Sequence, residues 1–401
     1  MTSPYSVPNQ AAVSSGMQRQ MEIYQLGLAG RRISVPTGIS ELERKAAEVL
    51  TPEAYDYVAG GASGERTMQA NLMAFDHWRI VPRMLRDVSE RDTKVELLGR
   101  NLPAPVLLGP VGVLNIVHPE AEVAVVRAAA ALGLPFVLST VSSRPMEEVA
   151  EASPSANRWF QLYWGKDHEL TESLLSRAEK ASYGALVVTL DTTMLGWRPR
   201  DLQHPYLPFL RGHGLANYFA DPVFCSRLAR PPQADPASAI QLWASLFSNT
   251  ALTWNDLRWL RGKTRLPILL KGILHPDDAR MAADYGADGV IVSNHGGRQV
   301  DGAMGALDAL PAVVSAVGER IPILFDSGIR HGADAVKALS LGARAVLLGR
   351  LYVWGLAIAG EQGVVDVVRN FLADFDLTLG LSGFRCIRDL NPSILTQSHV
   401  R

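Results

Sequence analysis

The sequence predicts an α/β fold, a (β/α)₈ TIM barrel, on two observations. Eight short apolar runs follow residue 103, and amphipathic helical stretches alternate with them. Parallel strands buried on both faces read as nearly continuous apolar runs, and strand–helix units in series close into a barrel. A doubly wound open sheet is the alternative, but its first strand is often followed by a glycine-rich turn. Here the first run leads into Pro110-Val-Gly.

The apolar runs and the stretches between them give the expected elements. The predicted strands are residues 105–109, 135–139, 159–163, 186–190, 267–271, 289–293, 322–326 and 345–349. The main predicted helices between them are residues 120–132, 169–181, 254–261, 276–285, 306–317 and 333–341.

Two segments fall outside this alternation. Residues 1–103 are expected to form an N-terminal helical preface that packs on the barrel, with one helix at 39–50 and a second from Pro52. Residues 104–401 are expected to form the barrel domain, interrupted at residues 196–252 after the fourth strand. A connection this long is usually functional or disordered. Because it carries aromatic residues such as Tyr206, Phe209 and Phe224, we expect a lid over the active site.

Composition and charge exclude several classes of function. A formal net charge of −1 supplies no field to attract nucleic acid or an anionic membrane. The two cysteines, Cys225 and Cys386, are far apart, so neither a disulfide framework nor a metal site is expected. The polar start at residues 1–16 lacks the features of a secretory signal, and no uninterrupted apolar run approaches the roughly 20 residues of a membrane span. We expect a cytoplasmic protein.

Polar or ionisable residues stand at nearly every predicted strand end, which is unusual for a purely structural barrel. In barrels of this type the catalytic groups gather at the C-terminal ends of the strands. In strand order these residues are Ser139; Gln161 and Tyr163; Thr189 and Asp191; Lys271; Ser293, Asn294 and His295; Asp326, Ser327, Gly328 and Arg330; and Gly349 and Arg350.

His295 is the candidate for a catalytic base. It follows a strand end and precedes two glycines, which leave room above the barrel mouth. An accessible histidine can remove a proton near neutral pH, and Asp191 could orient the ring and stabilise its cation. The alternative is an ordinary core or surface histidine. Arg198 and Arg298 are candidates for bidentate binding of a carboxylate, although Arg200 could face inward in place of Arg198.

The last two strand ends predict a phosphate site. Each is followed by a glycine-rich turn and an arginine, Arg330 or Arg350, and such turns bind phosphate through backbone N–H groups. A phosphorylated cofactor or substrate is therefore expected. Lys271 could place a positive charge beside an electron-accepting ring. The alternative is a buried lysine paired with a carboxylate such as Asp326.

The run Ser293-Asn-His-Gly-Gly-Arg-Gln299, with Asp301, resembles the active-site signature of the FMN-dependent L-2-hydroxy acid oxidases and dehydrogenases. The resemblance covers the chain from about residue 22 to about residue 390. Within that family, residues 22–30, 82–85, 196–201 and 208–212 look most like the lactate 2-monooxygenase branch.

The resemblance implies FMN as the cofactor and a role for each strand-end residue. His295 takes the substrate proton, from the hydroxyl in a hydride route or from Cα in a carbanion route, and Asp191 stabilises its cation. Lys271 faces the N1 and O2 edge of the flavin. The residues implied to bind substrate are Tyr57, Tyr163, Arg198 and Arg298. Those implied to bind the flavin ring are Pro110, Val111, Gly112, Ser139, Gln161, Thr189 and Ser293, and those for the ribityl phosphate are Asp326, Ser327, Gly328, Arg330, Gly349 and Arg350.

Two positions depart from the family pattern. Gly112 stands where many relatives have alanine, and we expect the missing methyl to change the space for oxygen or product beside the flavin. Val141 stands where glycolate oxidase has an aromatic residue, which argues against a glycolate-type substrate.

The expected reaction is the oxidation of a small L-2-hydroxy acid by O₂. L-lactate 2-monooxygenation is favoured, in which retained pyruvate and peroxide become acetate, CO₂ and water. An oxidase that releases the 2-oxo acid and H₂O₂ from lactate or a mandelate-type acid is the alternative. An FMN-dependent isomerase is an alternative from another class. The resemblance also implies a homotetramer or homo-octamer.

Overall fold

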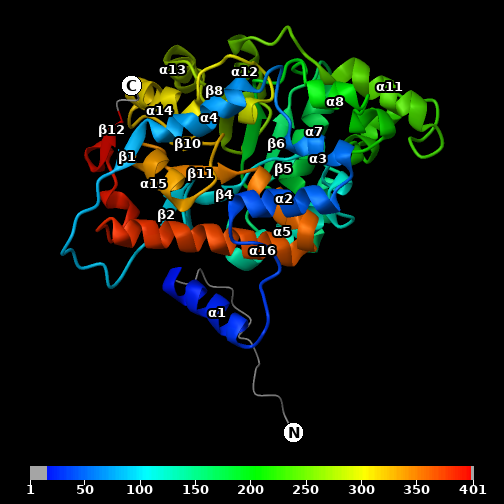
Figure 1. The fold of residues 1–401 in the computed structure, drawn as a ribbon. Coiled ribbons are helices and arrows are strands. Elements are labelled where there is room, and N and C mark those ends of the chain that lie inside the picture. The colour runs from blue at the N-terminus through cyan, green and yellow to red at the C-terminus, as the bar shows by residue number, and fades with distance from the viewer. Residues whose placement is uncertain (1–15, 399–401) are drawn as a thin grey trace.

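The computed structural model describes residues 16–398, so the predicted polar start lies outside it apart from Gly16. Eight parallel strands form a closed barrel in the order β10-β11-β4-β5-β6-β7-β8-β9, which confirms the predicted fold class (Figure 1). The strands are β4 Val106–Leu108, β5 Phe136–Ser139, β6 Arg158–Tyr163, β7 Leu186–Thr189, β8 Ile268–Ile273, β9 Gly289–Val292, β10 Ile323–Phe325 and β11 Ala345–Leu348.

Helices form the outer layer of the barrel. They are α5 Ala121–Leu132, α6 Met146–Ala152, α7 His168–Lys180, α12 Trp254–Arg261, α13 Pro276–Asp284, α14 Ala306–Val317, α15 Gly332–Ser340 and α16 Arg350–Leu381. The sequence did not predict α6 or α16. Helix α16 packs against α5, α15, α1 and α2. Apolar residues therefore occur on several of its faces, and the helical periodicity that marks an amphipathic helix is blurred.

Helix α16 is broken at Ala359 and Gly360, where φ is −149° and +58°. Among the described residues it is the one helix long and apolar enough to cross a membrane, but 67% of its apolar window is buried inside the protein. Its packing is that of a core helix.

A hairpin closes the end of the barrel where the strands begin. Strands β2 Val95–Leu97 and β3 Arg100–Leu102 pair antiparallel just before β4. Their apolar side chains form one buried cluster with the barrel interior: Val95, Leu97, Leu102, Leu107, Val137, Trp159, Val187, Leu269, Ile291, Leu324 and Leu347. The strand C-termini at the other end are left to form the site.

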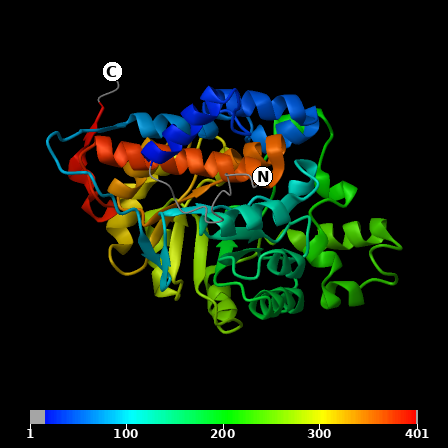
Figure 2. The same cartoon turned by 90° about the horizontal axis from the view of Figure 1, so that it is seen from below.

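The rest of the preface wraps around the barrel. It consists of α1 Gly16–Leu28, α2 Ile39–Val49, α3 Pro52–Ala59, α4 Arg66–Asp76 and β1 Trp78–Ile80, which pairs with β12 Leu395–Gln397 near the C-terminus. In Figure 2 the blue N-terminal helices lie along α16. Helices α2 and α3 confirm the two predicted starts, whereas α1 and α4 were not predicted. The division of the chain at residue 103 stays a prediction.

The predicted lid, residues 196–252, is a series of short helices that we call the cover segment. Its helices are α8 Pro199–Gln203, η2 Pro208–Arg211, α9 Ala216–Phe219, α10 Pro222–Ser226 and α11 Pro236–Phe247, on the right of Figure 1. Asn217 fastens it to the barrel, because its buried amide donates to Ser139 O and Thr140 O and accepts from Met146 N. Opening and closing of this segment stays a prediction.

Candidate active site

A cleft with about 1130 Å³ of empty space, open to solvent, lies at the C-terminal ends of the barrel strands. Fifteen of the predicted site residues line it: Tyr57, Pro110, Val111, Gly112, Tyr163, Arg198, Lys271, His295, Arg298, Asp326, Ser327, Gly328, Arg330, Gly349 and Arg350. The remaining five, Asp191, Ser139, Gln161, Thr189 and Ser293, do not line the cleft. The last four are buried, and Asp191 contacts His295.

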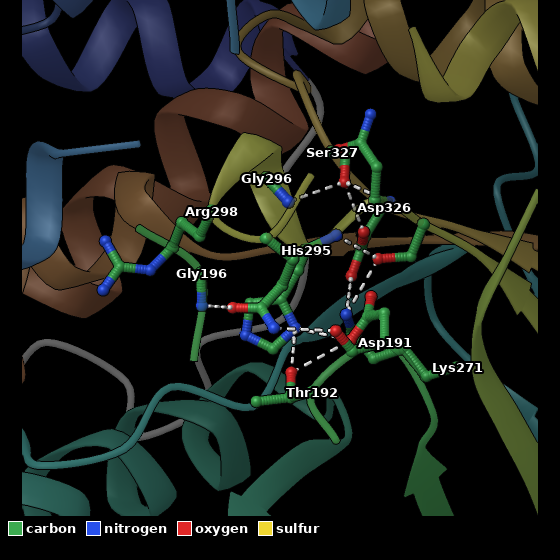
Figure 3. A network of polar contacts seen from close by, with 12 residues as sticks. Asp191, Thr192, Gly196, Lys271, His295, Gly296, Arg298, Asp326 and Ser327 are labelled. Carbon is green, nitrogen blue, oxygen red and sulfur yellow. Dashed lines mark hydrogen bonds and ion pairs between the residues drawn. The ribbon is translucent and has the colours of Figure 1, made fainter. Parts of the chain in front are cut away.

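His295 and Asp191 form a hydrogen-bonded pair at the cleft (Figure 3). His295 Nδ1 lies 2.8 Å from Asp191 Oδ1 and 3.3 Å from the hydroxyl of Thr192, which itself donates to Asp191 Oδ1 at 3.2 Å. Because Nδ1 faces the carboxylate, it carries the ring proton, and Nε2 is available to accept a proton from a substrate. The structure thus brings the predicted base and its partner together.

The charge states of this pair suit proton transfer. Burial lowers the pKa of His295 below its ordinary value, against the opposing effect of the Asp191 charge. Burial alone would raise the pKa of Asp191, but the interaction with His295 and the charge of Lys271 lower it. At neutral pH a neutral imidazole therefore stands beside a carboxylate, which stabilises the imidazolium formed when the ring accepts a proton.

This arrangement predicts a pH profile. We expect kcat/KM to fall as the pH decreases through the pKa of His295, because the protonated ring cannot act as a base. Since kcat/KM reports the free enzyme and the pKa lies below the ordinary value of 6.5, the midpoint of the acid limb should lie below pH 6.5. Steady-state kinetics of the holoenzyme across the pH range check this; a midpoint above that value would contradict it.

Two turns at the site are strained, the one that carries His295 and the one that carries Ser327. His295 and Ser327 have φ of +59° and +81°, in a region that side chains other than glycine rarely adopt. Ser293 Oγ accepts from His295 N, and Ser327 Oγ accepts from Gly296 N, both at 3.0 Å. A Cβ added at Gly296 would lie 2.9 Å from Arg350 Nη1. Gly296 therefore lets the Arg350 guanidinium approach the turn. This contact explains the glycine after His295 more specifically than the expected free space above the barrel mouth does.

Lys271 is a buried cation that lines the cleft. Its Nζ donates to Ser293 Oγ at 2.8 Å and lies 3.2 Å from Asp326 Oδ2. Burial lowers its pKa, but the charges of Asp326 and Asp191 outweigh that effect and raise it. The alternative from the sequence, a buried lysine paired with Asp326, is therefore correct for this ion pair. The paired ammonium nevertheless faces the cleft, where it can interact with a ligand.

Two arginines supply the predicted carboxylate site. Arg298 Nη1 donates to Tyr57 O and Gly60 O at 2.6 and 2.8 Å, and the guanidinium lies over the Tyr57 ring. Arg198 donates to Arg298 O and to Gln299 Oε1 at 3.1 and 2.8 Å. Arg198, rather than Arg200, faces inward. Burial lowers the pKa of Arg298 to about 10, so the side chain stays protonated at neutral pH.

The opposite part of the cleft fits a phosphate. Arg330 and Arg350 donate to backbone carbonyls, Arg330 to Ile329 O and Arg350 to Val58 O, Gly60 O and Gly296 O. Burial lowers the pKa of both guanidiniums, that of Arg350 to about 9. Within residues 16–398 neither has a carboxylate within 4.0 Å. Two partly buried cations without a direct ion pair favour a bound anion.

Polar groups buried next to Gly112, which lines the cleft, fit a heterocyclic ring with hydrogen-bonding edges. Gln161 Oε1 accepts from Ser139 Oγ and Thr140 N, at 3.0 and 3.3 Å. Its Nε2 is buried and has no partner within the described part of the chain. Such a donor calls for an acceptor, because an unsatisfied buried amide is costly. The orphaned amide and the unpaired arginines together fit a flavin ring that carries a phosphate.

Gly112 packs directly against Val141. A Cβ added there would lie 2.6 Å from Val141 Cγ2 and 2.7 Å from Val141 O, so an alanine methyl would point into Val141. Val141 itself lines the cleft and would have to shift, so the expected effect of Gly112 on the space for oxygen or product stays a prediction. Asp301 of the predicted signature also has a structural role, since it accepts from Gly64 N and Thr67 N at the start of α4.

Sequence reasoning missed part of the cleft wall. Thr192, Leu195 and Phe247 line the cleft, as do Val141 and Phe209, which the sequence singled out for other reasons. The Phe247 ring lies 5.3 Å from that of Tyr163, and 6.3 Å from that of Phe209. Thr192 could have been found from its place after Asp191. Phe247 ends an amphipathic helix, and nothing local distinguishes it from a core residue.

Comparison with known proteins agrees with this geometry. Residues 46–397 match the FMN-dependent dehydrogenase family, and the chain belongs to that family. The protein is thus an FMN-dependent oxidoreductase. That the residues described above hold the FMN stays a prediction. It is 46% identical to an L-lactate oxidase of Lysinibacillus sphaericus over 90% of this chain and 93% of the relative. It is 39% identical to human 2-hydroxyacid oxidase 1 over 90% of this chain and 96% of that protein.

The similarity extends to a solved structure. A crystal structure of mandelate oxidase covers 91% of this chain and 99% of its own, with a TM-score of 0.80 and 37% identity. The overall fold is therefore similar to that of the mandelate oxidase structure.

Proposed function

We propose that the protein oxidises a small L-2-hydroxy acid with an apolar side chain, with O₂ as the electron acceptor. The observation that carries this proposal is the set of groups around one cleft: a partly buried histidine base, two arginines, and an apolar wall. The wall consists of Val141, Leu195, Phe209 and Phe247. The lactate, 2-hydroxyacid and mandelate oxidases among the similar proteins support it.

Each part of such a substrate has a matching group. Arg198 and Arg298 bind the carboxylate, and the Tyr163 hydroxyl, whose pKa burial raises, stays protonated and donates to the substrate. His295 accepts the proton that leaves the substrate, and Asp191 stabilises the resulting cation. FMN supplies an acceptor for two electrons. An isomerase would have no use for paired arginines and a histidine at one end of the cleft, so the redox reaction is favoured.

We propose that the cleft retains pyruvate and H₂O₂ after the oxidation, which makes the overall reaction an L-lactate 2-monooxygenation. The cover segment supports this, because Phe209 and Phe247 close one side of the cleft and Asn217 fastens the segment to β5. Pyruvate held beside H₂O₂ is decarboxylated to acetate, CO₂ and water. The alternative is an oxidase that releases pyruvate and H₂O₂ separately, and the L-lactate oxidase relatives favour it.

Product analysis in air separates the two outcomes. We expect one acetate per O₂ consumed from L-lactate, and the yield should persist when catalase is present. Catalase destroys released peroxide, so acetate formed in its presence comes only from peroxide retained in the site. Pyruvate as the main product with catalase, and one H₂O₂ per lactate without it, would reject monooxygenation and establish the oxidase.

A further inference from the structure

A carboxyl group behind the cleft has no part in the reaction described so far. Glu122, in the first turn of α5, is fully buried and does not line the cleft. Its Oε1 accepts from Ser143 N at 2.9 Å and from Leu114 N at 3.4 Å. Its Oε2 is buried and without a partner among the described residues. Burying a carboxyl group costs free energy unless hydrogen bonds replace those it made to water. The two N–H groups that donate to Glu122 therefore indicate its role.

The two N–H groups belong to the turns that follow β4 and β5. The first turn carries Pro110, Val111 and Gly112 into the cleft, and the second carries Val141. The turns are also joined directly, since Val113 N donates to Val141 O at 2.9 Å. Glu122 therefore bridges the two backbone segments that form this wall of the cleft.

The Ser143 side chain extends the bridge to the cover segment. Its Oγ accepts from Asn115 N at 3.0 Å and lies 2.9 Å from Asn115 Oδ1. Asn115 Nδ2 lies 2.7 Å from Nδ1 of His213, which belongs to the cover segment. One connected set of polar contacts thus runs from the buried acid, through both turns, to the segment above the cleft.

The first turn needs this support because its backbone is strained. Val113 has φ of +58°, and a β-branched residue rarely adopts that region. Such a conformation persists only where the surrounding structure holds it. Val113 stands between Gly112, which lines the cleft, and Leu114, whose N–H is held by Glu122. Without an acceptor there, the turn can relax and carry the cleft-lining residues with it.

We propose that Glu122 is a positioning residue, whose Oε1 fixes the strained turn at Val113 and so sets the places of Pro110–Gly112 and Val141 in the cleft. The role lies in the acceptor atom, and either protonation state of the carboxyl retains it. Burial raises the pKa of Glu122 to about 7. The other titratable groups facing this region are Tyr183 and Tyr352, whose pKa values burial also raises, and His213, whose pKa burial lowers.

Two variants test the acceptor. Glu122→Leu removes it at similar size, and Glu122→Gln retains an oxygen. For Glu122→Leu we expect flavin reduction by L-lactate to slow by about 10- to 100-fold, since small displacements of reacting groups cost rates of this order. The absorbance and circular dichroism of its bound flavin should also shift, while FMN stays bound. Glu122→Gln should behave like the wild type in rate and spectrum.

A matched control separates positioning from stability. Asp366 on α16 is also a buried acid that accepts from a backbone N–H, that of Ser34, but it lies beside α1 and does not line the cleft. Asp366→Asn should lower Tm and leave the flavin spectrum and reduction rate unchanged. A Glu122→Leu holoenzyme with the wild-type spectrum and rate would overturn the proposal, as would an equal change in Asp366→Asn.

Two further measurements keep the proposal testable. If Glu122→Leu does not fold, Glu122→Met removes the acceptor with a flexible side chain of similar length, and the same spectral shift with slower reduction is expected; no change would overturn the proposal. The reduction readout rests on the proposed function, whereas the flavin spectrum without substrate does not. Wild-type protein that L-lactate fails to reduce therefore refutes the proposed function alone, and the spectra of the variants still decide the role of Glu122.

Discussion

Replacing His295 with glutamine is expected to slow flavin reduction by about 10²- to 10⁴-fold, the usual contribution of a positioned acid–base group. Glutamine is similar in size and keeps an amide near Asp191, but it cannot accept a proton. The FMN contacts predicted for Lys271, Arg330 and Arg350 do not involve the imidazole, so the cofactor should remain bound. Anaerobic stopped-flow measurement of the holoenzyme with L-lactate gives the rate directly.

The chain offers a matched control for this variant. His204 Nε2 lies 2.9 Å from Asp56 Oδ2, so it forms a histidine–aspartate pair of nearly the same length, yet neither residue lines the cleft. His204→Gln should leave the reduction rate unchanged. A His295→Gln enzyme that is reduced as fast as the wild type would refute the assignment of the base.

Replacing Arg298 with lysine is expected to raise KM and to lower kcat/KM by about 30-fold or more. Loss of one hydrogen-bonded partner of a buried ion pair costs about 2 kcal/mol or more. Lysine keeps the charge but loses the planar fork that donates to Tyr57 O and Gly60 O and can bind a carboxylate through two N–H groups. The variant should also discriminate less between L-lactate and its uncharged amide, because the fork recognises the carboxylate.

Arg200→Lys is the control for charge-conserving replacement. Arg200 pairs with Glu65 at 2.7 Å, and it does not line the cleft. Its kinetics should stay near those of the wild type. If Arg298→Lys keeps the wild-type KM and the wild-type preference for the acid over the amide, Arg298 does not bind the carboxylate.

The barrel could be predicted from the sequence because parallel strands buried on both faces leave an unmistakable apolar run. Each predicted strand lies within two residues of the observed one at either end. The cover segment was harder to predict, because its helices are only 4 to 12 residues long and most begin at a proline. Helix α16 was missed for the opposite reason, since contacts on several sides hide its periodicity.

The site was predictable where chemistry and position coincide. Residues at strand C-termini must meet at one end of a barrel. The sequence alone therefore predicted that His295, Asp191 and Lys271 lie in one site. The neighbour of Gly112 could not be predicted, because only the structure shows Val141 where an alanine methyl would point. Glu122 was not predicted either. Its proposed role depends on the strained backbone at Val113. The positive φ angle of one valine cannot be predicted from the sequence.

The central claim is that this cleft binds an L-2-hydroxy acid for oxidation. Anaerobic mixing of the FMN-loaded enzyme with L-lactate, D-lactate and larger L-2-hydroxy acids tests it most directly. We predict loss of the visible flavin absorbance with L-lactate and other apolar L-acids, and little or none with D-lactate. An absorbance that survives every L-2-hydroxy acid, while a chemical reductant removes it, would contradict the account.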